Sequence, residues 1–278
     1  MPVDGFLQSP ADIIRLTAGW EGERSADGRP HVGDDVLERI RTATSEDAWA
    51  TTHKHGYPRQ FASGWQQTHP GRVLVGRAVT AQFLPHRPDY DAAVVASGER
   101  DGLQDGDRQN SWVIDALGAG DVMVVDIFGK VVEGTVIGDN LGTAVAARTH
   151  AGAVIDGGVR DLAGLQRLDD VNFFYRAADP TPIRNVTLAG LNIPVRVGGA
   201  TVLPGDVVLG TATGVYFIPP HLAAELADSA WETASRDAFG KQRLREGRYS
   251  SASIDTSPWL DEIEADFQNW RELEGSTR

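Results

Sequence analysis

GTVIGDNLGTAVAARTHAGAVIDGGVRDLAGLQ, residues 134–166, is the stretch that decides the fold of this chain. The apolar run Val131 to Ile137 predicts a strand, and Leu141 to His150 carries apolar residues at helical spacing. A second apolar run, Ala153 to Asp156, predicts a buried strand that ends at a glycine turn, Gly157-Gly158. The order strand, helix, strand is typical of a crossover between two parallel strands.

This crossover is expected to bring polar residues together at one edge of a sheet. Parallel strands have their C-terminal ends at the same edge, so Asp139 after the first strand is expected to face Arg160 and Asp161 after the second. A helix N-terminus carries unpaired N–H groups and partial positive charge. The N–H groups of residues 140–142 are therefore candidates for binding an anion such as a carboxylate.

The side chains at this edge suit the chemistry of a 2-oxo acid. Arg160 can donate two hydrogen bonds to a carboxylate, and Asp139 and Asp161 supply the hard oxygen ligands that Mg²⁺ and Mn²⁺ accept. The same residues also fit a purely structural role, with Asp139 as a helix N-cap and the Arg-Asp pair as a turn with a surface salt bridge. Spacing alone leaves both interpretations open.

Composition excludes several classes of protein. The chain has 278 residues, enough for one large domain or one domain with extensions. Its net charge of −13 disfavours non-specific binding to nucleic acid or to an anionic membrane. The absence of cysteine excludes disulfides and thiolate sites. No apolar run approaches membrane-spanning length and the first residues do not resemble a signal peptide, so a cytoplasmic location is predicted.

The segments around the crossover are less regular in their patterns. Residues 1–44 read as a helical N-terminal extension, and Arg72 to Phe83 alternates as a pair of strands bent at Gly76. Residues 98–110 read as a flexible, polar insertion. We therefore expect a single domain over residues 1–278 whose periphery is mostly helical and looped.

The last part of the chain, residues 246–278, reads as a tail with one short helix. Trp259, Phe267 and Trp270 stand there among polar residues. Such aromatic side chains indicate that the tail docks, either onto a neighbouring subunit or onto its own domain.

Two further groups of polar residues are candidates for function. His53 and His55 form a His-x-His pair that could bind a metal, although no third ligand follows at matching spacing. His86 and Arg87 lie in a proline-bounded loop after the strand, where substrate contacts are common. Solvated loop residues are the alternative interpretation for His86 and Arg87.

Several motifs follow one another along the chain: GDVMVVD at 120–126, GDNL at 138–141, GAVIDGGVRD at 152–161, VRVGG at 195–199, PGDVV at 204–208 and GVYFIP at 214–219. In this order they resemble the RraA-like superfamily, which includes the class II 4-hydroxy-4-methyl-2-oxoglutarate (HMG/CHA) aldolases and the RraA regulators of ribonuclease E. The resemblance implies an α/β protein with a layered α/β/β fold around a central sheet or flattened barrel. The core would cover about residues 45–245, with helical N- and C-terminal extensions.

Within this superfamily the aldolases carry an Asp, twenty intervening residues and then Arg-Asp. Asp139, Arg160 and Asp161 match that pattern. The resemblance implies that Asp161 ligates Mg²⁺ or Mn²⁺ directly and that Asp139 contacts the metal through a water. Asp139 and Arg160 are the catalytic residues that it implies, with Arg160 stabilising an enolate and the substrate oxygens.

The resemblance also implies how the substrate is held. Gly138 and the backbone N–H groups near Asn140 and Leu141 would bind the pyruvyl carboxylate, together with Arg160. The implied activity is a divalent-metal-dependent cleavage of a 4-hydroxy-2-oxo acid to pyruvate and a carbonyl compound. Oxaloacetate decarboxylation is the expected side activity, because it passes through the same enolate.

An assembly and two rival functions complete these expectations. Family members form homotrimers or homohexamers in which a neighbouring subunit's C-terminal helix adds an acidic residue, for which Glu232 and Asp237 are candidates. Family members often carry an acidic residue where this chain has Gly164, and residues 98–110 and 172–186 look like insertions. The alternatives are a non-catalytic regulator that binds a ribonuclease and an aldolase for a sugar-derived 2-keto-3-deoxy acid.

Overall fold

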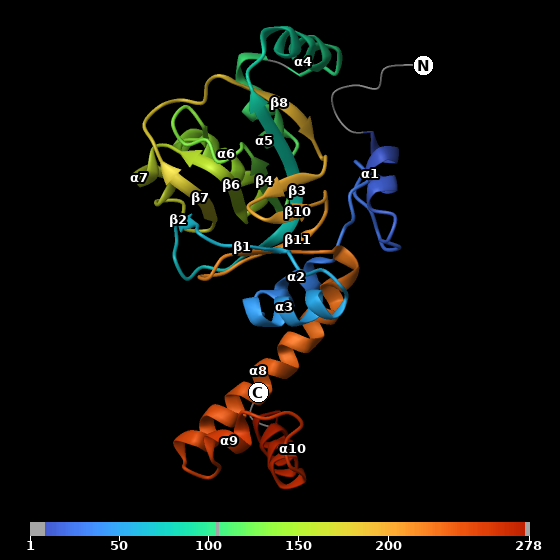
Figure 1. Cartoon of the computed structure of the whole chain (residues 1–278), viewed down its shortest axis with the longest axis vertical. Coiled ribbons are helices and arrows are strands. Elements are labelled where there is room, and N and C mark those ends of the chain that lie inside the picture. Colours follow the sequence, from blue (N-terminus) through green and yellow to red (C-terminus); the bar gives the residue numbers. More distant parts are fainter. Residues whose placement is uncertain (1–8, 104–105, 276–278) are drawn as a thin grey trace.

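A strongly curled sheet, which forms about half a barrel, is the centre of the structure (Figure 1). The computed structural model describes residues 9–103 and 106–275. In that part of the chain, ten strands join in the order β1-β12-β11-β3-β4-β6-β7-β2, with β5 added beside β6 and β8 beside β3. The strands are β1 (Phe61–Ala62), β2 (Gln66–Gln67), β3 (Leu74–Pro85), β4 (Asp121–Asp126), β5 (Thr135–Ile137), β6 (Gly152–Val159), β7 (Asn172–Ala178), β8 (Val186–Leu191), β11 (Val207–Gly210) and β12 (Val215–Ile218), and the separate hairpin is β9 (Val195–Val197) with β10 (Ala200–Val202).

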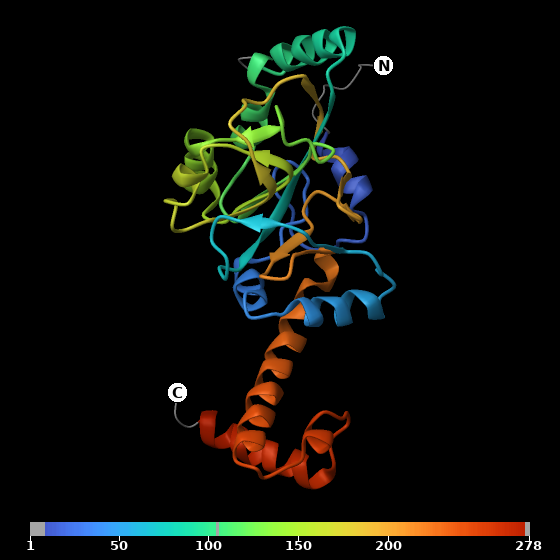
Figure 2. The ribbon, with the colours of Figure 1, turned by 60° about the vertical axis from the view of Figure 1, so that its left-hand side comes forward.

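Helices cover the sheet on more than one side, as Figures 1 and 2 show. Two short helices, α5 and α6, pack against the parallel strands, whereas α2, α3 and the first part of α8 pack against β11 and β12. The helices are α1 (Pro10–Leu16), α2 (Asp34–Ile40), α3 (Ser45–Lys54), α4 (Pro88–Arg100), η1 (Gly106–Arg108), α5 (Gln109–Asp115), α6 (Asp139–Thr149), α7 (Leu162–Leu165), η2 (Pro220–Leu222), α8 (Ala223–Arg245), α9 (Ser251–Ile254) and α10 (Asp261–Gly275). None of the helices in the described part of the chain combines the length and apolar character needed to cross a membrane.

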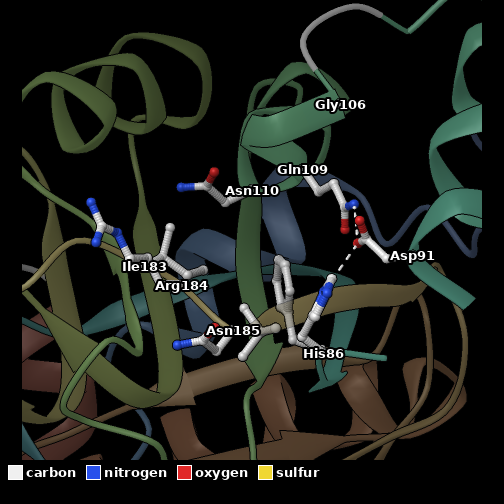
Figure 3. A pocket seen from close by; sticks show the side chains of 10 residues that line it. His86, Asp91, Gly106, Gln109, Asn110, Ile183, Arg184 and Asn185 are labelled. Carbon is white, nitrogen blue, oxygen red and sulfur yellow. Dashed lines mark hydrogen bonds and ion pairs between the residues drawn. The ribbon is translucent and has the colours of Figure 1, made fainter. Parts of the chain in front are cut away.

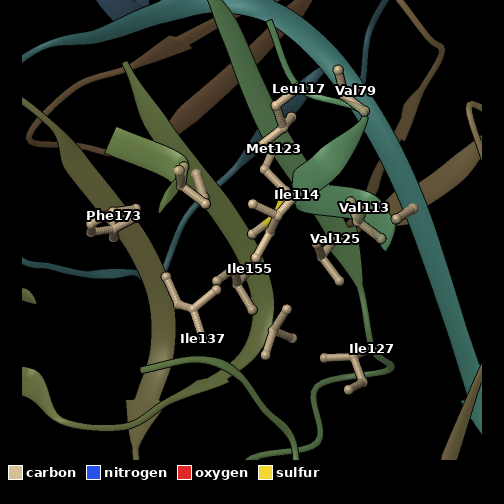
Figure 4. Close-up of a cluster of buried hydrophobic side chains, with 14 of the residues drawn as sticks. Val79, Val113, Ile114, Leu117, Met123, Val125, Ile127, Ile137, Ile155 and Phe173 are labelled. Atoms are coloured by element: carbon tan, nitrogen blue, oxygen red, sulfur yellow. The ribbon is translucent and has the colours of Figure 1, made fainter. Parts of the chain in front are cut away.

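The central strands are buried on both faces. In β4, Met123 and Val125 point to the α5–α6 side, where Figure 4 shows Met123 beside Ile114 of α5 and near Ile155 of β6. The alternate residues of β4 contribute to a second cluster under the β9–β10 hairpin. Side chains of a strand alternate between faces, so a continuous apolar run such as VMVV is what burial on both faces requires.

The C-terminal helices form an arm that leaves the sheet (Figures 1 and 2). Early in α8, Leu226 and Ala230 pack with α2, but Phe239 belongs to a separate apolar cluster with Ile263 and Phe267 of α10. The ring centroids of Phe239 and Phe267 lie 5.4 Å apart. The aromatic residues of the tail thus dock onto this chain's own α8. The described part of the tail, residues 246–275, contains two helices, so the prediction of a single short helix was wrong.

The strand–helix–strand crossover is confirmed as β5, α6 and β6, with β5 and β6 parallel. The first strand is shorter than predicted and begins at Thr135. The predicted turn at Gly157-Gly158 is wrong, because β6 continues through both glycines. A Cβ at Gly157 would lie 2.1 Å from Ile127 Cγ2, and one at Gly158 would lie 2.8 Å from the carbonyl oxygen of Val131. These glycines do not form a turn; they allow the loop before β5 to approach β6 closely.

Two other predictions of local structure were also wrong. β3 is one strand of 12 residues, and Gly76 does not bend it; a Cβ there would lie 2.5 Å from the Gly120 carbonyl oxygen. The described part of 98–110 includes the end of α4, η1 and the start of α5, and Gly98 lies against the ring of Trp112. Of residues 172–186, which look like an insertion relative to the family, 172–178 form β7, which pairs in parallel with β6.

Two turns of the fold repeat the same geometry. Gly118 to Asp121 precedes β4, and Leu203 to Asp206 precedes β11. In each turn the first residue's N–H donates to an aspartate Oδ2 at 2.8 Å, and the third residue is a glycine with positive φ. Both aspartates are buried, but only Asp121 has a cation: Arg29 donates to its two carboxylate oxygens at 2.9 and 3.1 Å. Asp206 has no comparable partner among the described residues.

Because Asp206 has no such cation in the described part of the chain, we predict that its titration makes the free energy of unfolding depend on pH. Burial raises the pKa of the Asp206 carboxyl to about 8, against an opposing effect of the Leu203 N–H bond. Between roughly pH 4 and pH 8 the folded state therefore binds more protons than the unfolded state, so the free energy of unfolding falls as pH rises, by at most about 1.4 kcal/mol per unit. In urea titrations across this window, D206N is expected to lose that part of the slope. Equal slopes for the two proteins would contradict the prediction.

Candidate active site

The β5–α6–β6 crossover places its polar residues at one edge of the sheet. β5 and β6 pair in parallel, and the N–H of Arg160 donates to the carbonyl oxygen of Ile137 at 3.0 Å. The residues that follow β5 therefore lie beside those that follow β6. This pairing brings the Gly138–Asp139 segment to Arg160 and Asp161, as the sequence predicted.

Gly138 is the point where the two segments meet. A Cβ at this position would lie 2.4 Å from Asp161 Oδ2 and 3.1 Å from Arg160 Nε. A side chain here would displace both functional groups, so glycine keeps the space beside them open. Gly164 likewise leaves room for the Asp139 carboxylate, since a Cβ at Gly164 would lie 3.0 Å from Asp139 Oδ2.

The N-terminus of α6 offers fewer free donors than the sequence suggested. The N–H of Asn140 donates to its neighbour's carboxylate, Asp139 Oδ1, at 2.8 Å. The N–H of Gly142 is also used, because it donates to the Gly138 carbonyl oxygen at 2.8 Å. Within residues 9–103 and 106–275, the N–H of Leu141 has no hydrogen-bond acceptor. Leu141 is thus the donor of residues 140–142 that remains available to an anion.

Arg160 and Asp161 form an ion pair at the surface. Arg160 Nη1 lies 3.2 Å from Asp161 Oδ2, and both side chains are about two-fifths exposed. An exposed pair of this kind contributes only about 0–1 kcal/mol, so little is lost when either group turns to a ligand. Asp161 has φ 53° and ψ 40°, a left-handed conformation that aspartate tolerates better than most residues. This conformation sets the direction of its carboxylate just past β6.

The donor set at this edge fits a hard divalent cation with a largely aqueous shell. No three acidic or histidine side chains gather into a metal-binding group in the part of the chain that is described. Asp139 and Asp161 offer two carboxylates, beside the space that Gly138 keeps open. Mg²⁺ is held by one or two carboxylates and several waters, so the residues present are compatible with it and with Mn²⁺.

Glu232 and Asp237 lie on the arm, away from this edge. Both belong to α8, which Figures 1 and 2 show leaving the sheet on the side opposite α6. Glu232 pairs with Arg236 and with Arg271, and Asp237 pairs with Lys241 at 2.7 Å. Neither acidic residue reaches Asp161 within one chain. A contribution to the site would have to come from another copy.

His86 lies in a separate polar cavity of about 190 Å³ (Figure 3). Its Nδ1 is 3.8 Å from Asp91 Oδ1, an atom that accepts hydrogen bonds from Gln109 at 3.0 Å and Thr187 at 2.7 Å. Sequence reasoning missed Asp91 and Gln109. Asp91 lies in an apolar run, and Gln109 lies in the segment expected to be a flexible insertion. Neither was therefore singled out as a candidate functional residue.

The other sequence candidates have structural partners. Arg87 pairs with Asp89 at 2.8 Å and does not line this cavity. His53 stacks on Trp49 with ring centroids 4.9 Å apart, and His55 Nε2 lies 2.8 Å from a carboxylate oxygen of Glu225. Both rings of the His-x-His pair thus contact other side chains of the chain.

The fold and the site geometry agree with comparisons to known proteins. A family described as RraA-like, Aldolase/RraA, matches residues 42–217, and the chain belongs to this family. A relative named 4-hydroxy-4-methyl-2-oxoglutarate aldolase, from Thermus thermophilus, is 30% identical over 107 residues, which are 38% of this chain and 64% of that protein. The match to another relative, from Halalkalibacterium halodurans, covers 47% of that protein's length. The chain therefore spans about half to two-thirds of the length of these relatives.

Solved structures carry the same fold. RraAS2 of Streptomyces coelicolor, described as an unusual member of the RNase ES inhibitor RraA protein family, has a TM-score of 0.64 and 27% identity, covering 77% of this chain and 98% of that one. An uncharacterized protein from Pseudomonas syringae pv. tomato has a TM-score of 0.65 and 21% identity, covering 82% of this chain and all of that one. The predicted RraA-like α/β fold with helical extensions is therefore confirmed.

Proposed function

We propose that this protein is a divalent-metal-dependent lyase that cleaves a 4-hydroxy-2-oxo acid to pyruvate and a carbonyl compound. The observation that carries the proposal is the position of Arg160 and Asp161 against Gly138, through the parallel pairing of β5 and β6, with Asp139 following Gly138 directly and its carboxylate lying beside Gly164. The names of the aldolase relatives support the same reaction class. The structural interpretation of Asp139 as a helix N-cap is wrong, because the N-cap of α6 is Gly138 and no described side chain caps it. A surface ion pair alone does not require two carboxylates near an open glycine.

The chain's own groups would hold the pyruvyl part of the substrate. The free N–H of Leu141, at the positive end of α6, would bind the C1 carboxylate. Arg160 would donate to the substrate oxygens from the other side, since its exposed pair with Asp161 leaves donors available. Asp139 and Asp161 would hold Mg²⁺ or Mn²⁺, which when bound supplies a Lewis acid for the 2-oxo carbonyl.

Cleavage requires a proton acceptor at the C4 hydroxyl and stabilisation of the charge that develops on the C2 oxygen. As the hydroxyl proton leaves, the C4–O bond becomes a carbonyl and the C3–C4 electron pair forms the enolate of pyruvate. Asp139 is the acidic side chain placed to receive or relay that proton, and Arg160 faces the developing negative charge. Protonation at C3 then releases pyruvate. Oxaloacetate would lose carbon dioxide through the same enolate.

The assay is pyruvate release from 4-hydroxy-4-methyl-2-oxoglutarate and from oxaloacetate, with Mg²⁺ or Mn²⁺ and then with EDTA. We expect turnover that EDTA abolishes and that added metal restores. Undiminished turnover in EDTA would contradict the proposal. Screening aldehydes with pyruvate in the synthetic direction identifies the acceptor, and preference for a sugar-derived aldehyde would identify the product as a 2-keto-3-deoxy acid instead.

The expected assembly is a homotrimer or homohexamer, with Glu232 or Asp237 reaching the site of a neighbouring copy. The support is geometric: α8 carries both residues on an arm that projects beyond the sheet (Figure 2). A cytoplasmic location and the absence of nucleic-acid and membrane partners remain predictions from composition. Sedimentation of the purified chain tests the assembly.

A second candidate function is that of a regulator without catalysis. The similarity to RraAS2, which is 27% identical over 77% of this chain, favours it. The acidic surface would then bind basic segments of a ribonuclease. Capture of a ribonuclease, combined with no lyase activity on any 2-oxo acid, would support this function over the first.

A further inference from the structure

A cavity of about 340 Å³ lies between α1, the β9–β10 hairpin and η2, away from the β5–β6 edge. We call it the Asp206 cavity. Its walls include Leu16 and Trp20 from the N-terminal segment, together with Tyr57, Pro220 and His221. Most of the lining is apolar and aromatic, which is the usual character of a small-molecule site. The proposed lyase reaction uses none of these residues.

The one carboxylate in this lining is buried and incompletely paired. Asp206 is 3% exposed, and its Oδ2 accepts the Leu203 N–H at 2.8 Å. Its Oδ1 accepts no hydrogen bond from any residue that the structure describes. In the equivalent turn, both carboxylate oxygens of Asp121 accept hydrogen bonds from Arg29, which supplies the positive charge. A buried carboxylate is stable as an anion only with a cation or several donors.

The charged groups near Asp206 are already engaged. On the segment packed against Gly205, Arg29 binds Asp121, and on the adjacent strand Arg77 donates to Asp34 at 2.8 Å. His31 on that same segment contacts Ser25. Besides Asp206, the titratable side chains that line the cavity are those of Tyr57 and His221, whose Oη and Nε2 lie 3.4 Å apart.

We propose that the Asp206 cavity binds a small primary amine, with its ammonium group against Asp206 Oδ1 and its apolar body against Trp20 and Tyr57. The ammonium supplies the cation that Arg29 provides in the equivalent turn. The aromatic walls supply apolar area and faces that attract a cation. The net charge of −13 favours the approach of a cationic ligand over an anionic one.

This mode of binding has a defined proton balance. Burial holds the pKa of Asp206 at about 8 in the free protein, so at lower pH the amine displaces the carboxyl proton as the ion pair forms. The affinity should therefore rise roughly tenfold between about pH 7 and about pH 9, as the carboxyl ionises. A ligand that accepts a hydrogen bond from the neutral carboxyl would show the opposite trend.

The test measures binding of 2-phenylethylamine to the full chain by calorimetry, with 2-phenylethanol as the neutral counterpart. We expect the amine to bind with a dissociation constant on the order of 1 mM or below, and the alcohol to bind more weakly and without the pH trend. Amine binding no tighter than alcohol binding at either pH would overturn the proposal, as would no binding of the amine.

Two variants assign the effect to Asp206. D206N can still accept the Leu203 N–H through its side-chain oxygen, so the turn should persist while amine binding falls to the level of the alcohol. H221Q removes the other group in the lining that titrates below pH 9 and should keep the pH trend. Unchanged amine binding in folded D206N, or loss of the trend in H221Q alone, would contradict the assignment.

Discussion

D161N is expected to lower the rate of pyruvate release by roughly a hundredfold or more, with the fold intact. The substitution removes the charge that would hold the metal but keeps the size of the side chain. Asparagine also tolerates the left-handed conformation of this residue, φ 53°. The carbonyl oxygen of Asp161, which accepts the N–H groups of Gly164 and Leu165, is unchanged.

The measurement is the initial rate with Mg²⁺ or Mn²⁺, together with calorimetric titration of the metal. Asp255→Asn is the matched control, since Asp255 is also exposed and also adjoins a four-residue helix, but it lies on the arm. The control should retain full activity and metal affinity. If D161N also retains them, the carboxylate has no part in catalysis and the site described above is structural.

The second large effect is on stability, through the buried pair of Arg29 and Asp121. Both residues are no more than 5% exposed, and Arg29 also donates to Asp27 at 2.6 Å. R29M leaves the Asp121 carboxylate buried without a cation. Breaking a buried pair in this way costs about 3–5 kcal/mol of unfolding free energy, because the remaining charge is desolvated. We expect a correspondingly lower urea midpoint.

A double variant separates lost charge pairing from lost packing. In R29M/D121N, the amide at position 121 can still accept the Gly118 N–H and needs no cation, so most of the stability should return. R41M is the control, because Arg41 pairs with Glu38 on the surface and should cost at most about 1 kcal/mol. A double variant as unstable as R29M would show that packing of the arginine stem is responsible.

The sequence was most informative where the pattern was local and strong. The apolar run of β4 and the order of strand, helix and strand around Asp139 required no distant information. Parallel pairing then followed from topology, and with it the meeting of Gly138 and Asp161. The α/β fold was predictable for the same reason, since each of its motifs is a short stretch of neighbouring residues.

Long-range contacts account for what the sequence could not provide. The sequence predicted a bend at Gly76, an insertion beginning at Gly98 and a turn at Gly157. In the structure, the missing side chain at each position leaves room for a residue from another part of the chain. Arg29 belongs to the N-terminal extension, and its partner Asp121 is 92 residues away. In the candidate site, the Gly142 N–H donates a hydrogen bond to the Gly138 carbonyl oxygen and is therefore not free for a ligand. This bond depends on the geometry of the α6 N-terminus, which the spacing of residues in the sequence does not determine.

The arm gives α8 two different environments along one continuous helix. Its first turns share a core with α2 and the sheet, and its last turns share one with α10, while Trp231 between them is 54% exposed. Amide hydrogens at the two ends of α8 would consequently exchange with solvent through two separate opening events, each with its own free energy. Hydrogen exchange along α8 would therefore measure the opening of two cooperative units separately.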